Sequence, residues 1–294
     1  MKRLSIIGIR ISASILVFIF FIATAFAQAN PSGFTVNKQG NGQPVILIPG
    51  LGCSADVWNS TIDSLKSHYT CYALNIDGFA GVPAVKGLTL KEISAGIASY
   101  IRSTIKEKVI LIGHSMGGVI SLMVASQHPE LIKKVLVIDA LPYLPAIRNP
   151  AATSKKIKSA ALEMKAKVIS QTKAQFKAST EKALSGMIAA RSKIPTVLDW
   201  CISSNRNFYG EMTYELMITD MRKQIAKIKA PVLVLGSWAA TKQYGLTEQI
   251  LQSAYEQQYQ NCKTVTVRMA PTAYHFIMID QPKWYIHQVL LFLK

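Results

Sequence analysis

The 294-residue sequence predicts an α/β fold in which helices cover both faces of a mostly parallel sheet. The first observation behind this prediction is that short apolar runs alternate with longer segments of helical periodicity, as in repeated strand–helix units. The second is that half of the residues are apolar and 17% are charged, so the chain can bury a large core. The third is that 4 Cys, 17 Gly and 12 Pro are too few or too scattered for a disulfide-rich, collagen-like or solenoid protein.

The first 27 residues have the features of a secretory signal peptide. Lys2 and Arg3 precede an apolar run that ends in an Ala-Phe-Ala cleavage motif at residues 25–27. We therefore expect cleavage near Ala27, a mature chain that begins at Gln28, and export to the periplasm or the medium. The alternative is an uncleaved anchor, because the apolar run is almost long enough to span a bilayer.

Strands and helices alternate through the first half of the mature chain. Residues 45–48 and 69–76 are apolar runs of strand length. Thr89 and Glu92 have the spacing of a capping box and begin a helix. The predicted buried stripe of this helix consists of Ile93, Ile97, Ile101 and Ile105. The elements that follow are a strand at 109–113, a helix at 117–127 and a strand at 135–139.

The alternation stops between residues 142 and 229, where a Lys-rich, Ala-rich stretch of helical character takes over. We interpret residues 142–229 as a helical cap inserted into a core that is made of residues 28–141 and 230–294. Asp280 is expected to cap the last helix. The core elements predicted after the cap are a strand at 231–236, a helix at 247–257, a strand at 264–269 and a helix at 282–293.

The chain is strongly basic, with a formal net charge of +17. The predicted cap holds most of the excess, because residues 148–229 contain 16 Lys or Arg against 6 Asp or Glu. Nucleic-acid binding is a poor explanation, since most of these cations are Lys, no nucleic-acid motif is present and the chain is expected to be exported. We interpret the charges as solvated helix faces, and attraction to an anionic envelope or substrate is the alternative.

The hexapeptide Gly-His-Ser-Met-Gly-Gly at residues 113–118 lies between a predicted strand and a predicted helix. This is the context in which a G-x-S-x-G motif forms a nucleophile elbow, a sharp turn that lifts the serine hydroxyl above the sheet. Its glycines allow the neighbouring strand and helix to approach closely. Ser115 is therefore the candidate nucleophile.

The sequence resembles members of the α/β-hydrolase superfamily, in particular esterase-like and lipase-like serine hydrolases with an inserted helical cap. The resemblance extends over about residues 34–293 and depends on five segments. These are Ile-Pro-Gly-Leu-Gly at 48–52, the motif at 113–118, His-Pro-Glu at 128–130, Pro-Val-Leu-Val-Leu-Gly at 231–236 and Tyr-His-Phe at 274–276. The family usually has His-Gly where this chain has Pro49-Gly50, a mild departure because that loop acts through its backbone.

A serine nucleophile needs a general base within hydrogen-bonding reach, and an imidazole suits this task near neutral pH. We assign His275 as the base, because it follows the predicted strand at 264–269, at the sheet edge where ligands of α/β proteins bind. The resemblance implies that His114 is a structural neighbour. The histidines expected at surface or helix-end positions are His68, His128 and His287.

The acid of a catalytic triad is missing from the position where the resemblance implies it. The chain reads Ser-Trp-Ala at residues 237–239, directly after Gly236, and has no carboxylate there. We assign Asp139 instead, because some esterases and dehalogenases of the superfamily carry their acid after the preceding strand. A buried carboxylate at this position would orient the imidazole of His275 and stabilise its protonated form. A loop-fixing role for Asp139 is the alternative.

The resemblance also implies an oxyanion hole made by the backbone N–H groups of Met116 and Leu51. Apolar and aromatic side chains of the cap are expected to line an acyl pocket or to form its helical core. These candidates are Met164, Met187, Met212, Met217, Met221, Trp200, Phe208, Tyr209 and Tyr214. Of the cysteine pairs, only Cys53 with Cys201 is compatible with a disulfide in this fold.

The sequence thus predicts an exported serine hydrolase that hydrolyses a carboxylic ester through an acyl-enzyme on Ser115. Its expected partner is a small apolar acyl substrate. No cofactor and no metal ion are expected, because no set of residues has metal-site spacing, and no integral membrane segment is expected after cleavage. Thioester, lactone and peroxyacid chemistry stay open, and a non-catalytic small-molecule-binding protein is the alternative from another class.

Overall fold

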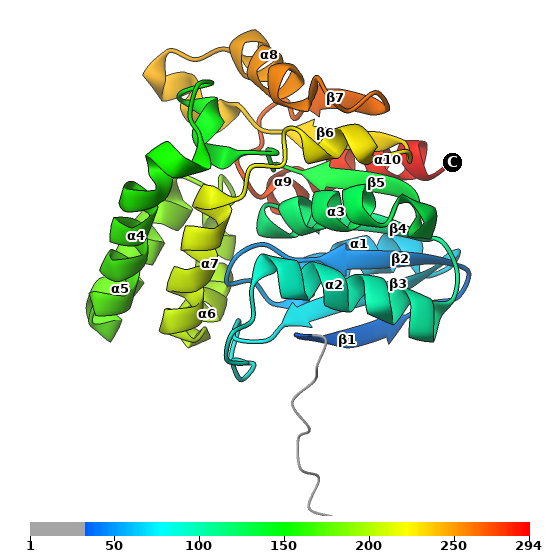
Figure 1. Ribbon diagram of the computed structural model, residues 1–294, viewed down its shortest axis with the longest axis horizontal. Coiled ribbons are helices and arrows are strands. Elements are labelled where there is room, and N and C mark those ends of the chain that lie inside the picture. The colour runs from blue at the N-terminus through cyan, green and yellow to red at the C-terminus, as the bar shows by residue number, and fades with distance from the viewer. Residues whose placement is uncertain (1–32) are drawn as a thin grey trace, which may run out of the picture.

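Within residues 33–294, which the computed structural model describes, seven strands form one sheet in the order β1-β3-β2-β4-β5-β6-β7 (Figure 1). The signal peptide predicted at residues 1–27 lies outside the described residues. β1 runs antiparallel to β3, and the other neighbouring strands are parallel. The strands are β1 (Phe34–Gln39), β2 (Gln43–Ile48), β3 (Tyr69–Ile76), β4 (Val109–His114), β5 (Ile132–Ile138), β6 (Val232–Gly236) and β7 (Val265–Met269).

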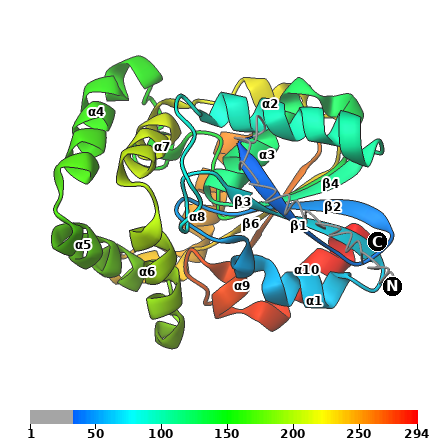
Figure 2. The ribbon, with the colours of Figure 1, turned by 90° about the horizontal axis from the view of Figure 1, so that it is seen from below.

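Helices cover both faces of this sheet, which confirms the predicted fold class (Figure 2). The helices on one face are α2 (Leu90–Tyr100), α3 (Met116–Gln127) and α8 (Glu248–Tyr259). Those on the other are α1 (Asn59–Leu65), α9 (Ile277–Asp280) and α10 (Pro282–Leu293). Among the described residues, no helix combines the length and the hydropathy needed to cross a membrane.

The apolar runs of the central strands follow from this two-sided cover. Ile46 and Leu111 pack toward α2 and α3, whereas the adjacent Val45 and Ile110 pack toward α1 and α10. Since successive strand residues point to opposite faces, a strand buried on both faces needs apolar residues at every position. This is why short uninterrupted apolar runs were a sound signal for the core strands.

Among the core elements, the sequence did not indicate β1, α1 or the 4-residue helix α9. Only the first residue of β1, Phe34, is buried, and the remainder of the strand is largely exposed at the edge of the sheet. An edge strand of this kind has no apolar run to reveal it. α1 is a short helix of 7 residues without a side-chain cap, so it also lacks a strong sequence signal.

The predicted cap, residues 142–229, contains α4 (Ser154–Ser170), α5 (Lys173–Ser185), α6 (Ile194–Ser203) and α7 (Arg206–Ile218). These helices lie beside the sheet, at the left of the view in Figure 1, where α4 packs against α7 and α5 against α6. Their side chains are mostly exposed away from these contacts, in agreement with the Lys-rich sequence. The cap therefore stands on one side of the core as a separate helical layer.

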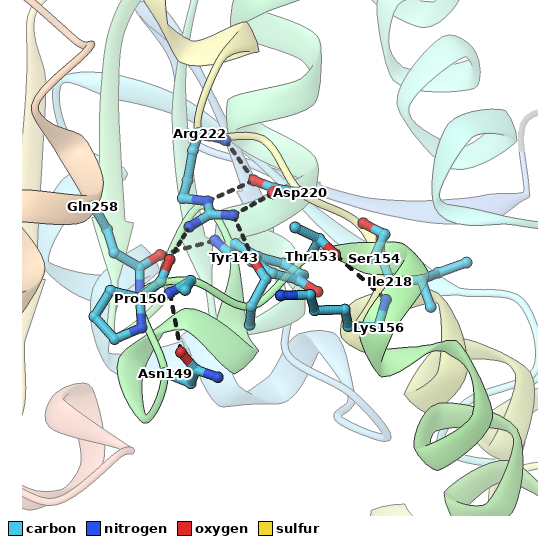
Figure 3. A network of polar contacts seen from close by, with 12 residues as sticks. Tyr143, Asn149, Pro150, Thr153, Ser154, Lys156, Ile218, Asp220, Arg222 and Gln258 are labelled. Carbon is cyan, nitrogen blue, oxygen red and sulfur yellow. Dashed lines mark hydrogen bonds and ion pairs between the residues drawn. The ribbon is translucent and has the colours of Figure 1, made fainter.

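Arg222 joins the two chain segments that connect these helices to the core (Figure 3). Its guanidinium donates to the carboxylate of Asp220 at 2.6 and 2.9 Å, and to the carbonyl oxygens of Pro150 and Ala152, both at 2.9 Å. It also lies over the ring of Tyr143, 4.8 Å from the ring centroid. One side chain thus ties the start of the cap segment to its end.

The glycines beside Ser115 give a prediction about stability. A Cβ on Gly117 would lie 2.1 Å from the carbonyl oxygen of Ile48, and backbone there cannot move without disturbing the pairing of β2 and β4. We expect Gly117→Ala to lower the free energy of unfolding by about 3 kcal/mol, measured by urea denaturation.

Gly186→Ala is the matched control for this measurement. Its Cβ would meet only the carbonyl oxygen of Ala183, at an ordinary 3.5 Å, and Gly186 has an ordinary φ of −92°. The free energy of unfolding should change by less than about 0.5 kcal/mol. Equal losses of unfolding free energy in the two variants would show that Gly117 is not closely packed against the backbone of Ile48.

Candidate active site

Ser115 occupies the sharp turn between β4 and α3. Its φ of 52° and ψ of −118° lie outside the regions that non-glycine residues ordinarily adopt. The turn is held because Ser115 N–H donates to the carbonyl oxygen of Ile138 at 2.9 Å, while Gly118 N–H donates to the carbonyl oxygen of Ser115 at 2.9 Å. A strained serine at a strand-to-helix turn is the geometry of a nucleophile elbow.

Ser115 lines a cavity of about 430 Å³ between the carboxyl ends of the strands and the cap. From the core, Asp139, Ser237, Tyr255 and His275 line the same cavity. The cap contributes Leu144, Met164, Leu184, Met187, Leu216 and Met217, among others. The carboxylate and the imidazole rings therefore lie on the core side of the cavity, and the cap side is mainly apolar, with Thr213 and the hydroxyl-bearing Tyr209 as its polar residues.

The cap residues that were candidates for an acyl pocket divide into three groups. Met164, Met187, Met217 and Tyr209 line the cavity. Met212, Met221 and Phe208 belong to the buried core. Trp200 and Tyr214 are outside the cavity lining, and Trp200 packs against the core instead.

His275 and Asp139 form a hydrogen-bonded pair, with Nδ1 of His275 2.6 Å from Oδ2 of Asp139. Asp139 directly follows β5, and His275 lies in the loop after β7, so the parallel strand order brings both to one edge of the sheet. The imidazole is 25% exposed and the carboxylate 8% exposed. Because Nδ1 carries the proton that is donated to the carboxylate, Nε2 is left as a proton acceptor.

The carboxylate of Asp139 accepts three further hydrogen bonds. Ser237 donates its N–H at 2.6 Å and its hydroxyl at 2.9 Å, and the hydroxyl of Tyr255 donates at 2.6 Å. Burial acts to raise the pKa of Asp139, but the hydrogen bonds from His275, Tyr255 and Ser237 outweigh it and hold the pKa below its ordinary value. Asp139 is therefore a buried carboxylate that stays ionised at neutral pH.

Ser237 and Tyr255 were not identified from the sequence. Ser237 directly follows β6, within the segment where the resemblance implied an acid, and it donates two hydrogen bonds to Asp139. A polar residue directly after a predicted strand was the sequence signal that could have identified Ser237. Tyr255 lies on α8, 116 positions from Asp139 along the chain, and only the folded arrangement brings the two together.

Asp280 does not cap α10, contrary to the sequence-based expectation. No side-chain hydrogen bond caps the start of α10. The carboxylate of Asp280 instead accepts the N–H groups of Ala189, Ala190 and Tyr274 at 2.9 to 3.1 Å, because the fold places these three donors around it. Asp280 thus joins the loop that carries His275 to the cap segment after α5.

His114 packs beneath His275 as a structural neighbour. Its Nε2 is 3.1 Å from the carbonyl oxygen of His275, and the two ring centroids are 4.6 Å apart. Burial, followed by the nearby imidazole of His275, lowers the pKa of His114 to about 3. The ring is therefore neutral and donates from Nε2. The histidines outside the cavity lining are His68, His128 and His287.

The predicted oxyanion-hole residues both lie close to Ser115 in the chain or in space. Leu51 lines the cavity in the loop after β2, and a Cβ on Gly50 would be 3.3 Å from Cβ of Ser115. Met116 is the first residue of α3, so its backbone N–H is one of those that the helix itself leaves unused. The structure therefore brings the loop after β2 and the start of α3 together beside Ser115.

All four cysteines are buried and free of disulfides. Cys53 and Cys201 line the cavity, but burial raises the pKa of the Cys201 thiol to about 12 and that of Cys53 well above its ordinary value. Both thiols are therefore protonated at neutral pH and are poor nucleophiles. Within residues 33–294, no cluster of three or more His, Cys, Asp or Glu has a metal-binding arrangement.

Comparison with curated proteins finds partial matches. The chain is 28% identical over 131 residues to the dihydrolipoyllysine-residue acetyltransferase component of the acetoin cleaving system of Cupriavidus necator, covering 43% of this chain and 35% of the relative. It is 27% identical over 98 residues to the pimeloyl-[acyl-carrier protein] methyl ester esterase of Citrobacter koseri, covering 33% and 37%. The chain thus spans little more than a third of these relatives.

A likeness in structure extends over nearly the whole described chain. The enol-lactonase of Burkholderia xenovorans superposes with a TM-score of 0.73 at 16% identity, covering 88% of this chain and 96% of the lactonase. At this identity the likeness shows the fold. A family model described as the alpha/beta hydrolase fold matches residues 43–282, which is more than half of the sequence. The chain therefore belongs to the α/β-hydrolase family.

Proposed function

We propose that this protein is a serine hydrolase that cleaves carboxylic esters through an acyl-enzyme on Ser115. The observation that carries the proposal is the hydrogen-bonded pair of Asp139 and His275 in the same cavity as the strained Ser115. The family supports an ester-hydrolysing enzyme, and one relative is named as a methyl ester esterase. The order Ser115, Asp139, His275 along the chain is that of the family's triads.

In the proposed first half-reaction, Nε2 of His275 accepts the hydroxyl proton of Ser115 while Oγ attacks the ester carbonyl carbon. Asp139 stabilises the imidazolium that forms. The backbone N–H groups of Met116 and Leu51 stabilise the oxyanion, each contributing about 3 kcal/mol. Collapse of the intermediate breaks the bond to the alcohol, which leaves with the proton from His275.

In the second half-reaction, water repeats the sequence on the acyl-enzyme. His275 takes a proton from the water as its oxygen attacks the acyl carbon, and then returns the proton to Oγ of Ser115. The products are a carboxylic acid and the free serine. Thioesters, lactones and peroxyacids can follow the same route, and one structural neighbour is named as an enol-lactonase.

The cavity lining supports a neutral, apolar acyl group as the substrate. Among the described residues that line it, none is a Lys, Arg or Glu, and the cap side consists mainly of Leu, Ile and Met. A buried carboxylate on a substrate would find no cation there. We propose a small apolar ester as the partner, and neither nucleic acid nor a cofactor.

Export is part of the same proposal. It is supported by the basic start, the apolar run and the Ala-Phe-Ala motif of residues 1–27. The alternative of a non-catalytic binding protein was motivated by the missing acid after Gly236. Asp139 supplies a carboxylate to His275 from the neighbouring strand, which weakens that motive.

Replacement of Ser115 distinguishes the proposed enzyme from the alternative, a non-catalytic binding protein. We expect the mature protein to be labelled by a fluorophosphonate probe and to hydrolyse p-nitrophenyl esters, and Ser115→Ala to lose both, because no other activated nucleophile lines the cavity. Cys53→Ala is the control and should keep the labelling. An intact protein that neither reacts with the probe nor turns over any ester would support the binding protein instead.

Replacement of the acid tests the assignment of Asp139. Asp139→Asn should lower kcat by about 10³ to 10⁴, because an amide favours the wrong tautomer of His275 and cannot stabilise its protonated form. KM should change little, since the side-chain volume is conserved. Steady-state kinetics on a p-nitrophenyl ester measure both constants, and a fall in kcat of less than tenfold would reject the assignment.

The uncharged lining predicts selection against charged acyl groups. We expect kcat/KM for the neutral six-carbon ester p-nitrophenyl hexanoate to be about 100-fold higher than for mono-p-nitrophenyl adipate, which has the same chain length and a terminal carboxylate. This ratio corresponds to about 3 kcal/mol. The comparison uses one leaving group and one chain length, so charge is the variable. Equal values of kcat/KM would mean that the acyl group does not enter the apolar cavity.

A further inference from the structure

We infer that Tyr255 and Ser237 are positioning residues that hold the carboxylate of Asp139 against His275, which allows the triad acid to act from the end of β5. This inference rests on the proposed function. It concerns two residues from two different parts of the fold, and both act on His275 through the carboxylate of Asp139.

The four hydrogen bonds to Asp139 divide evenly between its two oxygens. Oδ1 accepts from Ser237 N–H and from the hydroxyl of Tyr255, both at 2.6 Å. Oδ2 accepts from the hydroxyl of Ser237 at 2.9 Å and from Nδ1 of His275 at 2.6 Å. Any rotation of the carboxyl group would break bonds at both oxygens, so the donors fix the plane in which Asp139 meets the imidazole.

Asp139 needs this support because of where it lies. It has a φ of 46°, which is unfavourable for a residue with a side chain, and it follows the end of β5 rather than the end of β6. Its backbone is held by its N–H, which donates to the carbonyl oxygen of Leu235 at 2.7 Å. Besides His275, the donors that hold the side chain are Ser237, directly after β6, and Tyr255 on α8.

The end of β6 is shaped to admit Tyr255. A Cβ on Gly236 would be 3.2 Å from Cε1 of Tyr255 and closer still to the side chain of Met269. Gly236 thus leaves the space through which the Tyr255 ring reaches Asp139. Burial and the neighbouring carboxylate raise the pKa of Tyr255 well above its ordinary value, so its hydroxyl remains a donor throughout the working pH range.

The hydroxyls of Tyr255 and Ser237 each act to lower the pKa of Asp139. Their removal would therefore raise the pKa of Asp139. Activity that requires the ionised carboxylate beside His275 would then be lost at a higher pH as the solution is acidified. The acid limb of the kcat/KM profile is therefore the readout that a purely structural role would not move.

α8 supplies a matched control in Tyr259. Tyr259 is also fully buried, but its hydroxyl donates to the backbone carbonyl oxygen of Ala140 at 2.9 Å and makes no hydrogen bond to Asp139. Tyr255→Phe and Tyr259→Phe each remove one buried hydroxyl from the same helix. A difference between them in catalysis reports the contact with the carboxylate rather than the general cost of such a deletion.

The experiment compares kcat, KM and the pH profile of p-nitrophenyl ester hydrolysis in the two tyrosine variants. Tyr255→Phe is expected to lower kcat by about tenfold, a typical value for a lost hydrogen bond to a charged group, and to move the acid limb to higher pH. Tyr259→Phe should leave kcat within about twofold and the limb in place. Ser237→Ala should shift the limb in the same direction, and Ser237→Thr, which keeps the hydroxyl, should restore it.

A second readout does not need activity. With aspartate labelled by ¹³C at its carboxyl carbon, NMR titration follows the ionisation of Asp139 directly, and its midpoint should rise in Tyr255→Phe and stay unchanged in Tyr259→Phe. If the intact protein hydrolyses no ester, the proposed function fails while the titration still tests the positioning. If hydrolysis occurs but both tyrosine variants match the parent in kcat, acid limb and Asp139 midpoint, the inference is overturned.

Discussion

The close approach of α3 to the ends of β2 and β4 is the constraint on which the candidate site depends. Glycines at positions 113 and 117 leave no side chain between helix and strands, and a Cβ at either would meet backbone at 2.2 or 2.1 Å. This packing forces the chain to turn sharply at Ser115 and leaves its backbone in a strained conformation. The packing of the backbone alone thereby holds Ser115 at the carboxyl edge of the sheet.

The polar core residues that share the cavity with Ser115 gather there because β5, β6 and β7 are parallel neighbours. Each strand ends at the same edge, so the residues directly after them meet even though they are far apart in the chain. Asp139 follows β5, Ser237 follows β6, and His275 lies in the loop after β7. The carboxylate that is paired with His275 therefore comes from the end of β5, and Ser237, directly after β6, donates hydrogen bonds to it.

The cap completes the site from the other side. Its mainly apolar residues close a cavity whose carboxylate and imidazole groups, those of Asp139, His114 and His275, belong to the core. Arg222 ties the two connecting segments of the cap together, and Asp280 joins the His275 loop to the segment after α5. The cavity and the candidate triad thus depend on contacts between core and cap as well as on the sheet.

The sequence by itself determined the fold class, the strands from β2 to β7 and the elbow. The two-sided burial of β2 to β6 leaves apolar runs, and the close packing at the elbow leaves glycines, as local signals. It also identified Ser115, His275 and Asp139 as candidates, since each ends or follows a strand. Only the tertiary structure decided that Tyr255 and Ser237 surround Asp139, that Asp280 binds cap N–H groups, and which cap side chains face the cavity. Those contacts join residues about a hundred positions apart or depend on the rotation of a helix about its axis. A local sequence pattern predicts neither.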